Sequence, residues 1–376
     1  MSFEYGETVK ITLWGTSHGP EVGMMLTGLP AGESVDMEQV QAMLNRRAPG
    51  GAHRSARQER DIPQYLSGLK NNVTDGTPLR AVIPNEDVRS GDYDARRTIP
   101  RPSHADYAAV MKYGPGVDLR GGGVFSGRMT APLCLAGAIC EQILARRGIT
   151  VGAHLAAVGD IDDRPFDPVA VDQASLLALR RLEPPVLDAR AGAQMLALIA
   201  QAADGHDSVG GMVECAAVGL PPGLGAPLFG GLESRLAAAA FAIPAVKGIE
   251  FGAGFSAARM RGSEHNDSFY WHGGAVNTRT NRHGGILGGL SSGMPLLLRV
   301  AFKPTPSIGR EQDSVDLATG ENVRLAISGR HDPCIALRAV PVCEAVMSLV
   351  LLDVILTPSE PAAAPEAGEM APQTPP

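Results

Sequence analysis

The sequence of 376 residues predicts a mixed sheet-and-helix fold in which two similar halves, about 9–150 and 207–356, pack around one core. Three landmarks recur in the same order in both halves, which is typical of duplicated units rather than independent domains. They are Gly-Leu-Pro-x-Gly after an apolar run (28–32 and 219–223), Gly-x-Pro-Leu before an apolar strand (76–79 and 293–296), and Gly-Arg before a long apolar helix (127–128 and 329–330).

The first half is predicted to start with a strand over 9–14 and a second apolar strand that stops at Gly28. A helix over 37–45 follows, with Ser34 or Asp36 as its N-cap, because these side chains accept bonds from the first free N–H groups of a helix. The remaining elements are a strand over 80–84, a short helix from Tyr107 toward Met111 with Asp106 as a candidate cap, and an apolar helix over 132–146.

Residues 152–203 are predicted to form a helical connector between the halves. One helix spans 168–182, with Asp167 as cap and Pro168 at the first helical position, and another spans 191–203. The second half then has a helix over 232–241, a strand over 297–302 and a helix over 341–356. The tail, 357–376, is rich in Pro, Ala and Glu without an apolar period, which predicts disorder.

Composition excludes several classes of protein. With 33 Lys and Arg against 40 Asp and Glu, the net charge of −7 argues against nucleic-acid binding. The apolar run 345–352 is too short to span a membrane. The first 15 residues have neither a basic nor an apolar signal segment, so we expect a cytoplasmic protein. Five cysteines without C-x-x-C spacing predict buried thiols rather than disulfides or zinc ligands.

Two polar segments of the first half stand out. His18 lies in a Gly-flanked turn after a strand, where a histidine either donates a proton to a ligand or only bonds to the backbone. The loop from Arg46 and Arg47 continues through His53, Arg54 and Arg57 to Arg60. Such a loop is either a solvated charged segment or a flap that closes over a polyanion.

Two further segments follow. Arg101, His104 and Asp106 lie within six residues, either as a polar site or as a helix start. The Gly-rich run 120–128 is neither a Walker A loop nor a dinucleotide fingerprint. The N–H groups of Val124, Phe125 and Ser126, with Arg128, predict either an anion site or a tight turn.

The second half contains a matching set of polar candidates. Lys303 with the two hydroxyls of Thr305 and Ser307 on a Pro-spaced turn fits a phosphate clamp. A glycine track over 284–293 precedes it, and Arg330, His331 and Asp332 precede the last helix. A metal site built from His18, His104, His331 and Asp332 is not supported by any local His or Cys spacing, so we predict no metal.

Taken together and in this order, the motifs resemble those of the chorismate synthase family. The resemblance covers the chain to about residue 356 and includes three signature regions, 15–30, 123–137 and 330–346. The chain differs from the family pattern at Thr16, Ser103, Cys134 and in the flap around His53 and Arg54. The matches outside the signature regions are the loop at Arg46, Arg-x-Glu-x-Asp at Arg57, Val-Lys-Gly at Val246 and the KPTPS segment at Lys303.

This resemblance implies an α+β fold, a β-α-β sandwich with two antiparallel sheets around a helical layer, in a single domain over 1–356 that assembles as a homotetramer. It implies anti-1,4-elimination of phosphate from 5-enolpyruvylshikimate 3-phosphate to give chorismate, the last common step of aromatic amino-acid biosynthesis. Reduced FMN is required without net redox change. Family members either receive reduced FMN from a separate flavin reductase, which we expect here, or reduce it themselves with NADPH.

The resemblance also implies roles for individual residues. His18 protonates the leaving phosphate, His104 stabilises the reduced flavin, Asp332 relays a proton, and Ser17 and Ser126 position the ligands. An FMN-dependent oxidoreductase and a non-catalytic anion-binding protein remain as alternatives. The residues implied for the substrate's anionic groups are Arg46, Arg47, Arg101, Arg128 and Arg330, and those implied for FMN are Val124, Phe125, Ser126, Gly288, Lys303, Pro304, Thr305, Pro306, Ser307 and Arg330.

Overall fold

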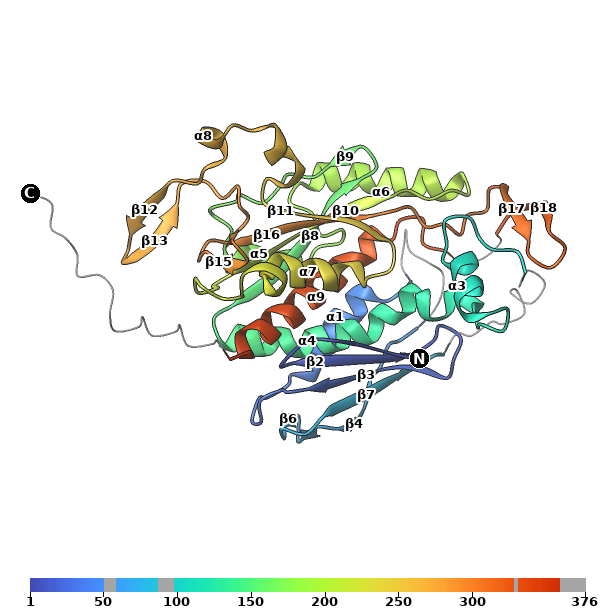
Figure 1. Cartoon of the computed structure of the whole chain (residues 1–376), viewed down its shortest axis with the longest axis horizontal. Coiled ribbons are helices and arrows are strands. Elements are labelled where there is room, and N and C mark those ends of the chain that lie inside the picture. The colour runs from blue at the N-terminus through green and yellow to red at the C-terminus, as the bar shows by residue number, and fades with distance from the viewer. Residues whose placement is uncertain (51–58, 87–97, 328–330, 359–376) are drawn as a thin grey trace, which may run out of the picture.

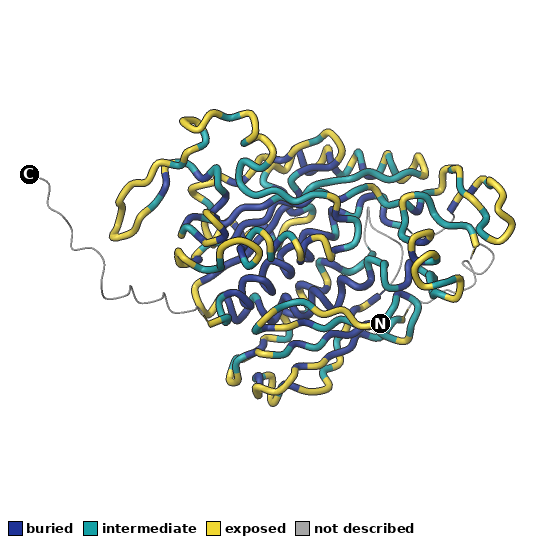
Figure 2. Tube along the Cα trace, viewed as in Figure 1, coloured by how far each residue is buried: buried dark blue, intermediate teal, exposed yellow. Residues whose placement is uncertain are grey.

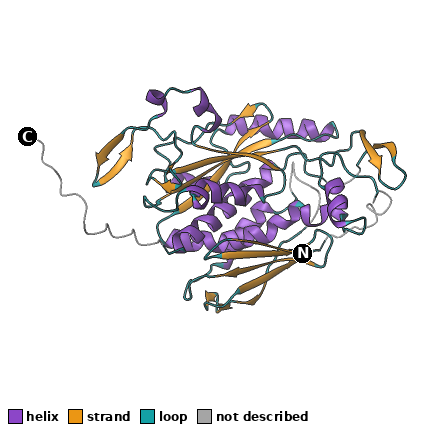
Figure 3. Ribbon diagram, viewed as in Figure 1, coloured by secondary structure: helices purple, strands orange, loops and turns teal. Residues whose placement is uncertain are grey.

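The protein is a three-layer sandwich in which two antiparallel sheets enclose a layer of helices (Figure 1 and Figure 3). The computed structural model describes residues 1–50, 59–86, 98–327 and 331–358. The basic loop around His53 and Arg54, Arg330 and most of the predicted disordered tail lie outside the described residues.

The first sheet contains the strands predicted at 9–14 and 80–84. Its order is β1-β2-β3-β7-β4, and every neighbouring pair is antiparallel. One face of β3 is buried against the helices, because Val22, Met24 and Leu26 alternate along the strand and are all inaccessible. The strands are β1 (Ser2–Tyr5), β2 (Lys10–Gly15), β3 (Glu21–Thr27), β4 (Gln64–Ser67) and β7 (Leu79–Pro84).

The second sheet has the order β11-β16-β10-β8-β9, again with antiparallel neighbours. Its central strands are buried along most of their length because helices cover the inner face, while α5, α6 and their connecting segments lie on the other side (Figure 1). The strands are β8 (Thr150–Val158), β9 (Ile161–Asp162), β10 (Gly211–Val218), β11 (Val246–Phe251) and β16 (Leu296–Phe302).

The two sheets share a connection pattern. The order β2-β3-β7-β4 in one corresponds to β8-β10-β16-β11 in the other, with α1 after β3 and α7 after β10. This correspondence supports the proposed internal repeat. It also places the start of the second unit at β8, near residue 150, instead of at 207.

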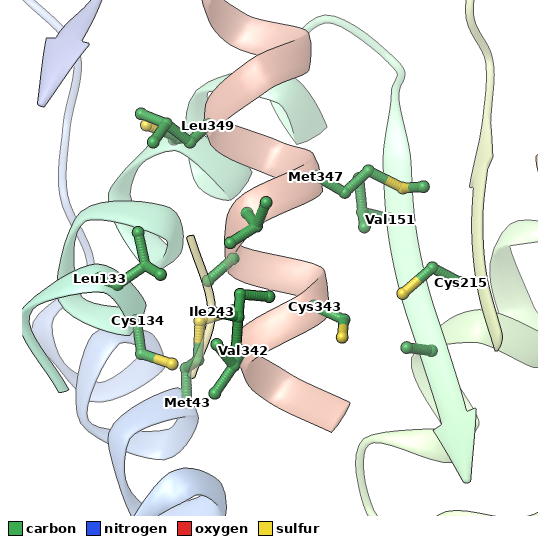
Figure 4. Close-up of a cluster of buried hydrophobic side chains, with 14 of the residues drawn as sticks. Met43, Leu133, Cys134, Val151, Cys215, Ile243, Val342, Cys343, Met347 and Leu349 are labelled. Carbon is green, nitrogen blue, oxygen red and sulfur yellow. The ribbon is translucent and has the colours of Figure 1, made fainter. Parts of the chain in front are cut away.

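Four helices fill the middle layer. They are α1 (Met37–Arg47), α4 (Thr130–Arg146), α7 (Leu232–Phe241) and α9 (Ala336–Leu356). Gly137 allows α4 and α9 to approach closely, since a Cβ at this position would lie 2.3 Å from Cα of Ala345. Figure 4 shows aliphatic and sulfur-bearing side chains of α1, α4, α9 and the second sheet meeting in this core, and Figure 2 shows the core as the buried centre of the chain. All five cysteines are free and buried there, as predicted.

Helix α9 is long and apolar enough to cross a membrane, with 21 residues and a mean hydropathy of 2.2 over its best window. However, 89% of that window is buried inside the protein, so α9 is the central core helix. It begins at Ala336, five residues before the predicted start at Pro341, so Pro341 lies inside the helix.

The predicted helical connector, 152–203, is wrong in part. Strands β8 and β9 occupy its beginning, and only α5 (Gln173–Leu179) and α6 (Ala189–Asp204) are helical. Asp172 caps α5, whereas Asp167 closes a separate turn by accepting from the N–H groups of Val169 and Ala170. In the first half, Asp36 caps α1, accepting from the N–H groups of residues 38 and 39.

The remaining elements are short and mostly peripheral. They are β5 (Leu69–Lys70), β6 (Val73–Thr74), α3 (Asp106–Tyr113), η1 (Arg120–Phe125), η2 (Gly127–Met129), η3 (Leu228–Gly230), η4 (Gly254–Arg259), α8 (Gly262–His265), β12 (Phe269–His272), β13 (Ala275–Thr278), β14 (Ile286–Leu287), β15 (Leu290–Ser291), β17 (Gln312–Asp316) and β18 (Glu321–Leu325).

Candidate active site

A cavity of about 640 Å³ lies where the C-terminus of α1 meets the N-termini of α4 and α9. Arg47 reaches it from α1, Thr130 from α4, and the first turns of α9 contribute 335–342. Loops from both sheets complete the wall: the turn after β2, residues 101–105, residues 121–128, residues 241–246 and the segment after β16. Two helix N-termini at one cavity favour an anionic ligand.

A three-glycine turn brings the two candidate histidines into this cavity. Gly121, Gly122 and Gly123 all have positive φ, at 57°, 93° and 55°. A Cβ on Gly121 would lie 2.1 Å from Cε1 of His18, and a Cβ on Gly122 would lie 3.5 Å from Nε2 of His104. The turn therefore packs against both rings at once: a side chain at Gly121 would overlap His18, and at Gly122 the positive φ favours glycine.

His104 is held by a carboxylate and an arginine. Its Nδ1 lies 2.6 Å from Oδ1 of Asp106, and Arg101 donates to both oxygens of the same carboxylate at 2.7 and 2.8 Å. Burial raises the pKa of Asp106, but the hydrogen bonds from Arg101 and His104 outweigh it and hold this pKa well below its usual range. Asp106 is thus not the cap of α3, which has no side-chain cap.

Two arginines on the cavity wall share one buried carboxylate. Nη2 of Arg47 donates to Oδ2 of Asp61 at 2.8 Å, and Nη1 of Arg128 donates to Oδ1 of Asp61. Burial lowers the pKa of Arg47 to about 10, opposed by the negative charge of Asp61 and assisted by the positive charges of Arg338 and Arg128. Both guanidinium groups face little water, since each side chain is 2% exposed.

The carboxylate of Asp332, which lines the cavity, accepts a hydrogen bond from Arg338 at 2.5 Å. Arg338 also donates to the backbone carbonyl of Arg47 at 2.9 Å, so it joins the start of α9 to the end of α1. His331 lies beside them, and its pKa is lowered by burial and then by the nearby charge of Arg101. Sequence reasoning did not assign a role to Arg338, because its helical neighbours gave no local signal.

Lys303 lies at the cavity next to the 101–105 loop. Its ammonium group donates to the carbonyl of Ser103 and, at 3.1 Å, to the hydroxyl of Ser103. Nη1 of Arg101 also lies 3.4 Å from the hydroxyl of Ser307. Burial, followed by repulsion from Lys247, lowers the pKa of Lys303. The segment 303–307, which was predicted to bind phosphate, and the loop 101–105, which contains His104, therefore form one wall of the cavity.

The apolar part of the wall comes mainly from a segment whose place at the site was not predicted from the sequence. Residues 241–246, between α7 and β11, line the cavity together with Phe302 and Val342. Ala245 has a φ of 75°, and its carbonyl accepts from the N–H of Lys303 at 3.0 Å. The Val-Lys-Gly match at Val246 was the sequence signal for this wall, but nothing local indicated that it faces the histidines.

Most of the sequence-predicted residues meet in this cavity, whereas four do not line it. Ser17 is fully buried beneath the turn, Pro304 packs near Gly210, and Gly288 lies in the β14–β15 turn. Arg46 points to the buried Glu344, at 2.5 Å. Arg330 lies outside the described residues. Those that line the cavity are His18, Arg47, Arg101, His104, Val124, Phe125, Ser126, Arg128, Lys303, Thr305, Pro306, Ser307 and Asp332.

The cavity is strongly cationic. Five permanently or usually positive side chains line it, against the carboxylates of Glu59 and Asp332. Among the described residues no cluster of three His, Cys, Asp or Glu is suited to a metal ion. The arrangement can bind a small polyanion, donate protons from two histidines and hold a flat group against the apolar wall. The five cations are Arg47, Arg101, Arg128, Lys303 and Arg338.

Comparisons with known proteins agree with the resemblance. A family model for chorismate synthase matches residues 9–356. A chorismate synthase from Lancefieldella parvula is 44% identical over 372 residues, covering 96% of this chain and 98% of the relative. One from Dehalococcoides mccartyi is 46% identical over 357 residues, covering 95% and 97%.

A solved structure supports the fold as well. A crystal structure of chorismate synthase matches with a TM-score of 0.73 at 26% sequence identity, over 94% of this chain and 93% of the other. The α+β architecture predicted from the sequence is thereby confirmed. On sequence and fold together, the chain belongs to the chorismate synthase family of lyases.

Proposed function

We propose that the cavity described above is the site where this lyase eliminates phosphate from 5-enolpyruvylshikimate 3-phosphate to give chorismate. The observation that carries the proposal is the concentration of five cations and three histidines in one cavity of a chain whose net charge is −7. The substrate carries two carboxylates and a phosphate. Such a polyanion matches guanidinium forks, which bind carboxylate and phosphate through paired hydrogen bonds.

We propose that reduced FMN binds beside the substrate, and the residues present fit it. The cavity volume of about 640 Å³ lies within the range of about 300–1,000 Å³ that is usual for ligand sites. The wall at 241–246 suits a flat ring, and Lys303 has three donor hydrogens, two of which bond to Ser103, so a further one can meet a ligand oxygen. When bound, reduced FMN supplies an electron-rich ring that assists phosphate loss and takes up the C6 hydrogen.

His18 is proposed as the proton donor to the leaving phosphate. An imidazole titrates near neutral pH, so it can carry a proton to the departing oxygen and return to its starting form. The adjacent three-glycine turn fixes the ring, because it contacts Cε1 closely. Arg47 and Arg128 would neutralise the phosphate oxygens as negative charge develops on them.

His104 is proposed to stabilise the negative charge of the reduced flavin. The carboxylate of Asp106 stays ionised and lies 2.6 Å from Nδ1, so it fixes the orientation of the ring. Asp332, held by Arg338, would relay a proton. Ser126 lines the cavity and caps η2 through the N–H of Arg128, so we assign it to positioning the loop and the ligand.

The family resemblance is the basis for our proposals on the oligomeric state of the enzyme and on its source of reduced FMN. We propose a cytoplasmic homotetramer that receives reduced FMN from a separate flavin reductase. Reduction of the flavin by this chain with NADPH is the alternative. An FMN oxidoreductase that turns over nicotinamide as its main reaction is not favoured, because relatives at 44–46% identity are chorismate synthases.

Alanine variants of the two histidines test the proposed roles. In His18→Ala and His104→Ala, we expect most of the turnover to be lost, by about 10²-fold or more, while thermal unfolding and flavin binding stay near those of the wild type. His272→Ala, on the exposed strand β12, is the matched control and should keep full turnover. Near-native turnover in either cavity variant would remove that histidine from the mechanism.

A further inference from the structure

Asp61 is a buried carboxylate that lies behind the cavity wall without lining it. It comes two residues after Glu59 and just before β4, and its side chain is fully inaccessible. Its φ is 51°, in the left-handed region that Asp and Asn tolerate better than most residues other than glycine. A buried charge in this conformation needs strong partners.

Those partners are the two arginines that face the proposed phosphate position. Each carboxylate oxygen of Asp61 accepts from one guanidinium group, Oδ2 from Arg47 and Oδ1 from Arg128. Each arginine also has a lateral partner: Nε of Arg128 donates to the side chain of Asn85 at 2.8 Å, and Nη1 of Arg47 donates to the hydroxyl of Thr130 at 3.3 Å. The carboxylate therefore fixes the spacing and direction of two forks at once.

The charges of Arg47, Arg128 and Asp61 also indicate that the carboxylate supports the two arginines. The two buried guanidinium groups repel each other because little water screens their charges. One shared carboxylate reduces the net charge of the three groups to +1. Burial, assisted by the positive charges of Arg338 and Arg128, lowers the pKa of Arg47 to about 10 even with Asp61 present. Cys134 is also nearby, and burial raises the pKa of that thiol to about 12, so it stays neutral. Without Asp61, Arg47 would lose its proton at a lower pH.

We infer that Asp61 is a positioning residue for the substrate: its carboxylate aims Arg47 and Arg128 into the cavity and offsets the repulsion between their positive charges. This inference rests on the proposed active site, since it assumes that the two arginines bind the substrate's anionic groups. Removing the carboxylate should weaken substrate binding and leave the proton-donating groups, His18 and His104, in place. The loss should consequently fall more on KM than on kcat.

Asp61→Asn tests the inference with little change of shape or backbone strain. Substrate binding is measured by calorimetry without flavin, from pH 7.5 to 9.5, where the substrate phosphate is fully ionised. We expect the variant to bind about tenfold to a hundredfold more weakly at pH 7.5. Its affinity should fall further as pH rises, whereas that of the wild type stays nearly constant. Loss of the proton from Lys303 also affects affinity as pH rises, but Lys303 is present in both proteins. The ratio of the wild-type affinity to that of Asp61→Asn therefore reports the protonation of Arg47.

Two further variants separate positioning from simple destabilisation. Asp61→Glu keeps the charge, so its affinity should show no added dependence on pH even if the longer side chain weakens binding. It also carries the test if Asp61→Asn does not fold. Asp163→Asn is the matched control and should keep wild-type affinity, because Asp163 is a buried carboxylate that follows β9, bonds to His154 and does not line the cavity.

The possible outcomes distinguish failure of the role of Asp61 from failure of the proposed active site. Wild-type affinity and an unchanged pH profile in Asp61→Asn, with the wild type binding substrate normally, would overturn the role of Asp61 and leave the active site standing. A pH-dependent loss in Asp61→Glu would overturn it as well. If the wild type itself fails to bind 5-enolpyruvylshikimate 3-phosphate, the proposed site is wrong and the role of Asp61 falls with it.

Discussion

Replacing Gly121 with alanine perturbs the proposed site at its tightest contact. The added Cβ would lie 2.1 Å from Cε1 of His18. Carbon atoms in contact are normally about 3.5–4.0 Å apart, so the imidazole or the turn must move by about 1.4 Å. The backbone at Gly121 also has a φ of 57°, which an alanine adopts at a cost of about 1–2 kcal/mol.

These two effects should appear in different measurements. Backbone strain lowers the free energy of unfolding by about 1–2 kcal/mol, which urea denaturation detects. Displacement of a proton donor by about 1 Å can reduce turnover about 10²-fold. In Gly121→Ala we therefore expect a modest loss of stability together with a loss of about 10²-fold in kcat, measured by anaerobic chorismate formation with chemically reduced FMN.

Gly148→Ala is the control for strain alone. Gly148 follows α4 with a φ of 77°, and a Cβ there would meet nothing within 4 Å. We expect a similar loss of stability and unchanged kcat. Equal turnover in the two variants, or near-native turnover in Gly121→Ala, would refute the claim that the glycine turn fixes a catalytic His18.

Two other changes follow from buried ion pairs outside the cavity. Arg46→Ala should destabilise the fold by about 3–5 kcal/mol, because it leaves the carboxylate of Glu344 buried and without its ion-pair partner. Substrate KM should stay unchanged, since Arg46 does not line the cavity. A raised KM in folded protein would restore the predicted role of Arg46 at the substrate. His154 lies between Asp163 and Glu214, both at 2.8 Å, and although burial lowers its pKa, the hydrogen bonds to these carboxylates raise it overall. Its stabilisation should be complete below about pH 6.5 and lost as pH rises through the raised pKa. Urea denaturation from pH 7 to 8.5 should show this decline in the wild type, and an equal decline in His154→Gln would contradict the assignment.

Local sequence signals predicted the elements that have clear ends. The helix over 232–241 has the predicted bounds, and Asp36 caps α1 as one of two proposed caps. Strand β8 was missed because its sequence, TVGAHLAAV, is buried on both faces and therefore lacks the alternation that identifies a strand. Its glycine and alanines also have low strand propensity.

The site was predictable where its chemistry is contiguous in sequence. The turns at His18 and His104, the glycine run and the segment at Lys303 each carry their own signal, and they meet in one cavity. Directions of side chains were not predictable: Arg46 and Arg47 are adjacent, yet one pairs with Glu344 and the other lines the cavity. The role of Asp61 depends on two arginines that are 14 and 67 residues away, which no local pattern reveals.

The most direct measurement of the central claim is anaerobic conversion of 5-enolpyruvylshikimate 3-phosphate, with phosphate and chorismate quantified together. We expect one phosphate per chorismate with chemically reduced FMN, no net oxidation of the flavin, and no turnover with oxidised FMN and NADPH alone. Turnover under the second condition would show that the chain reduces its own flavin and would contradict the proposed separate reductase. Absence of chorismate with reduced FMN, despite bound flavin, would contradict the proposed reaction in this cavity.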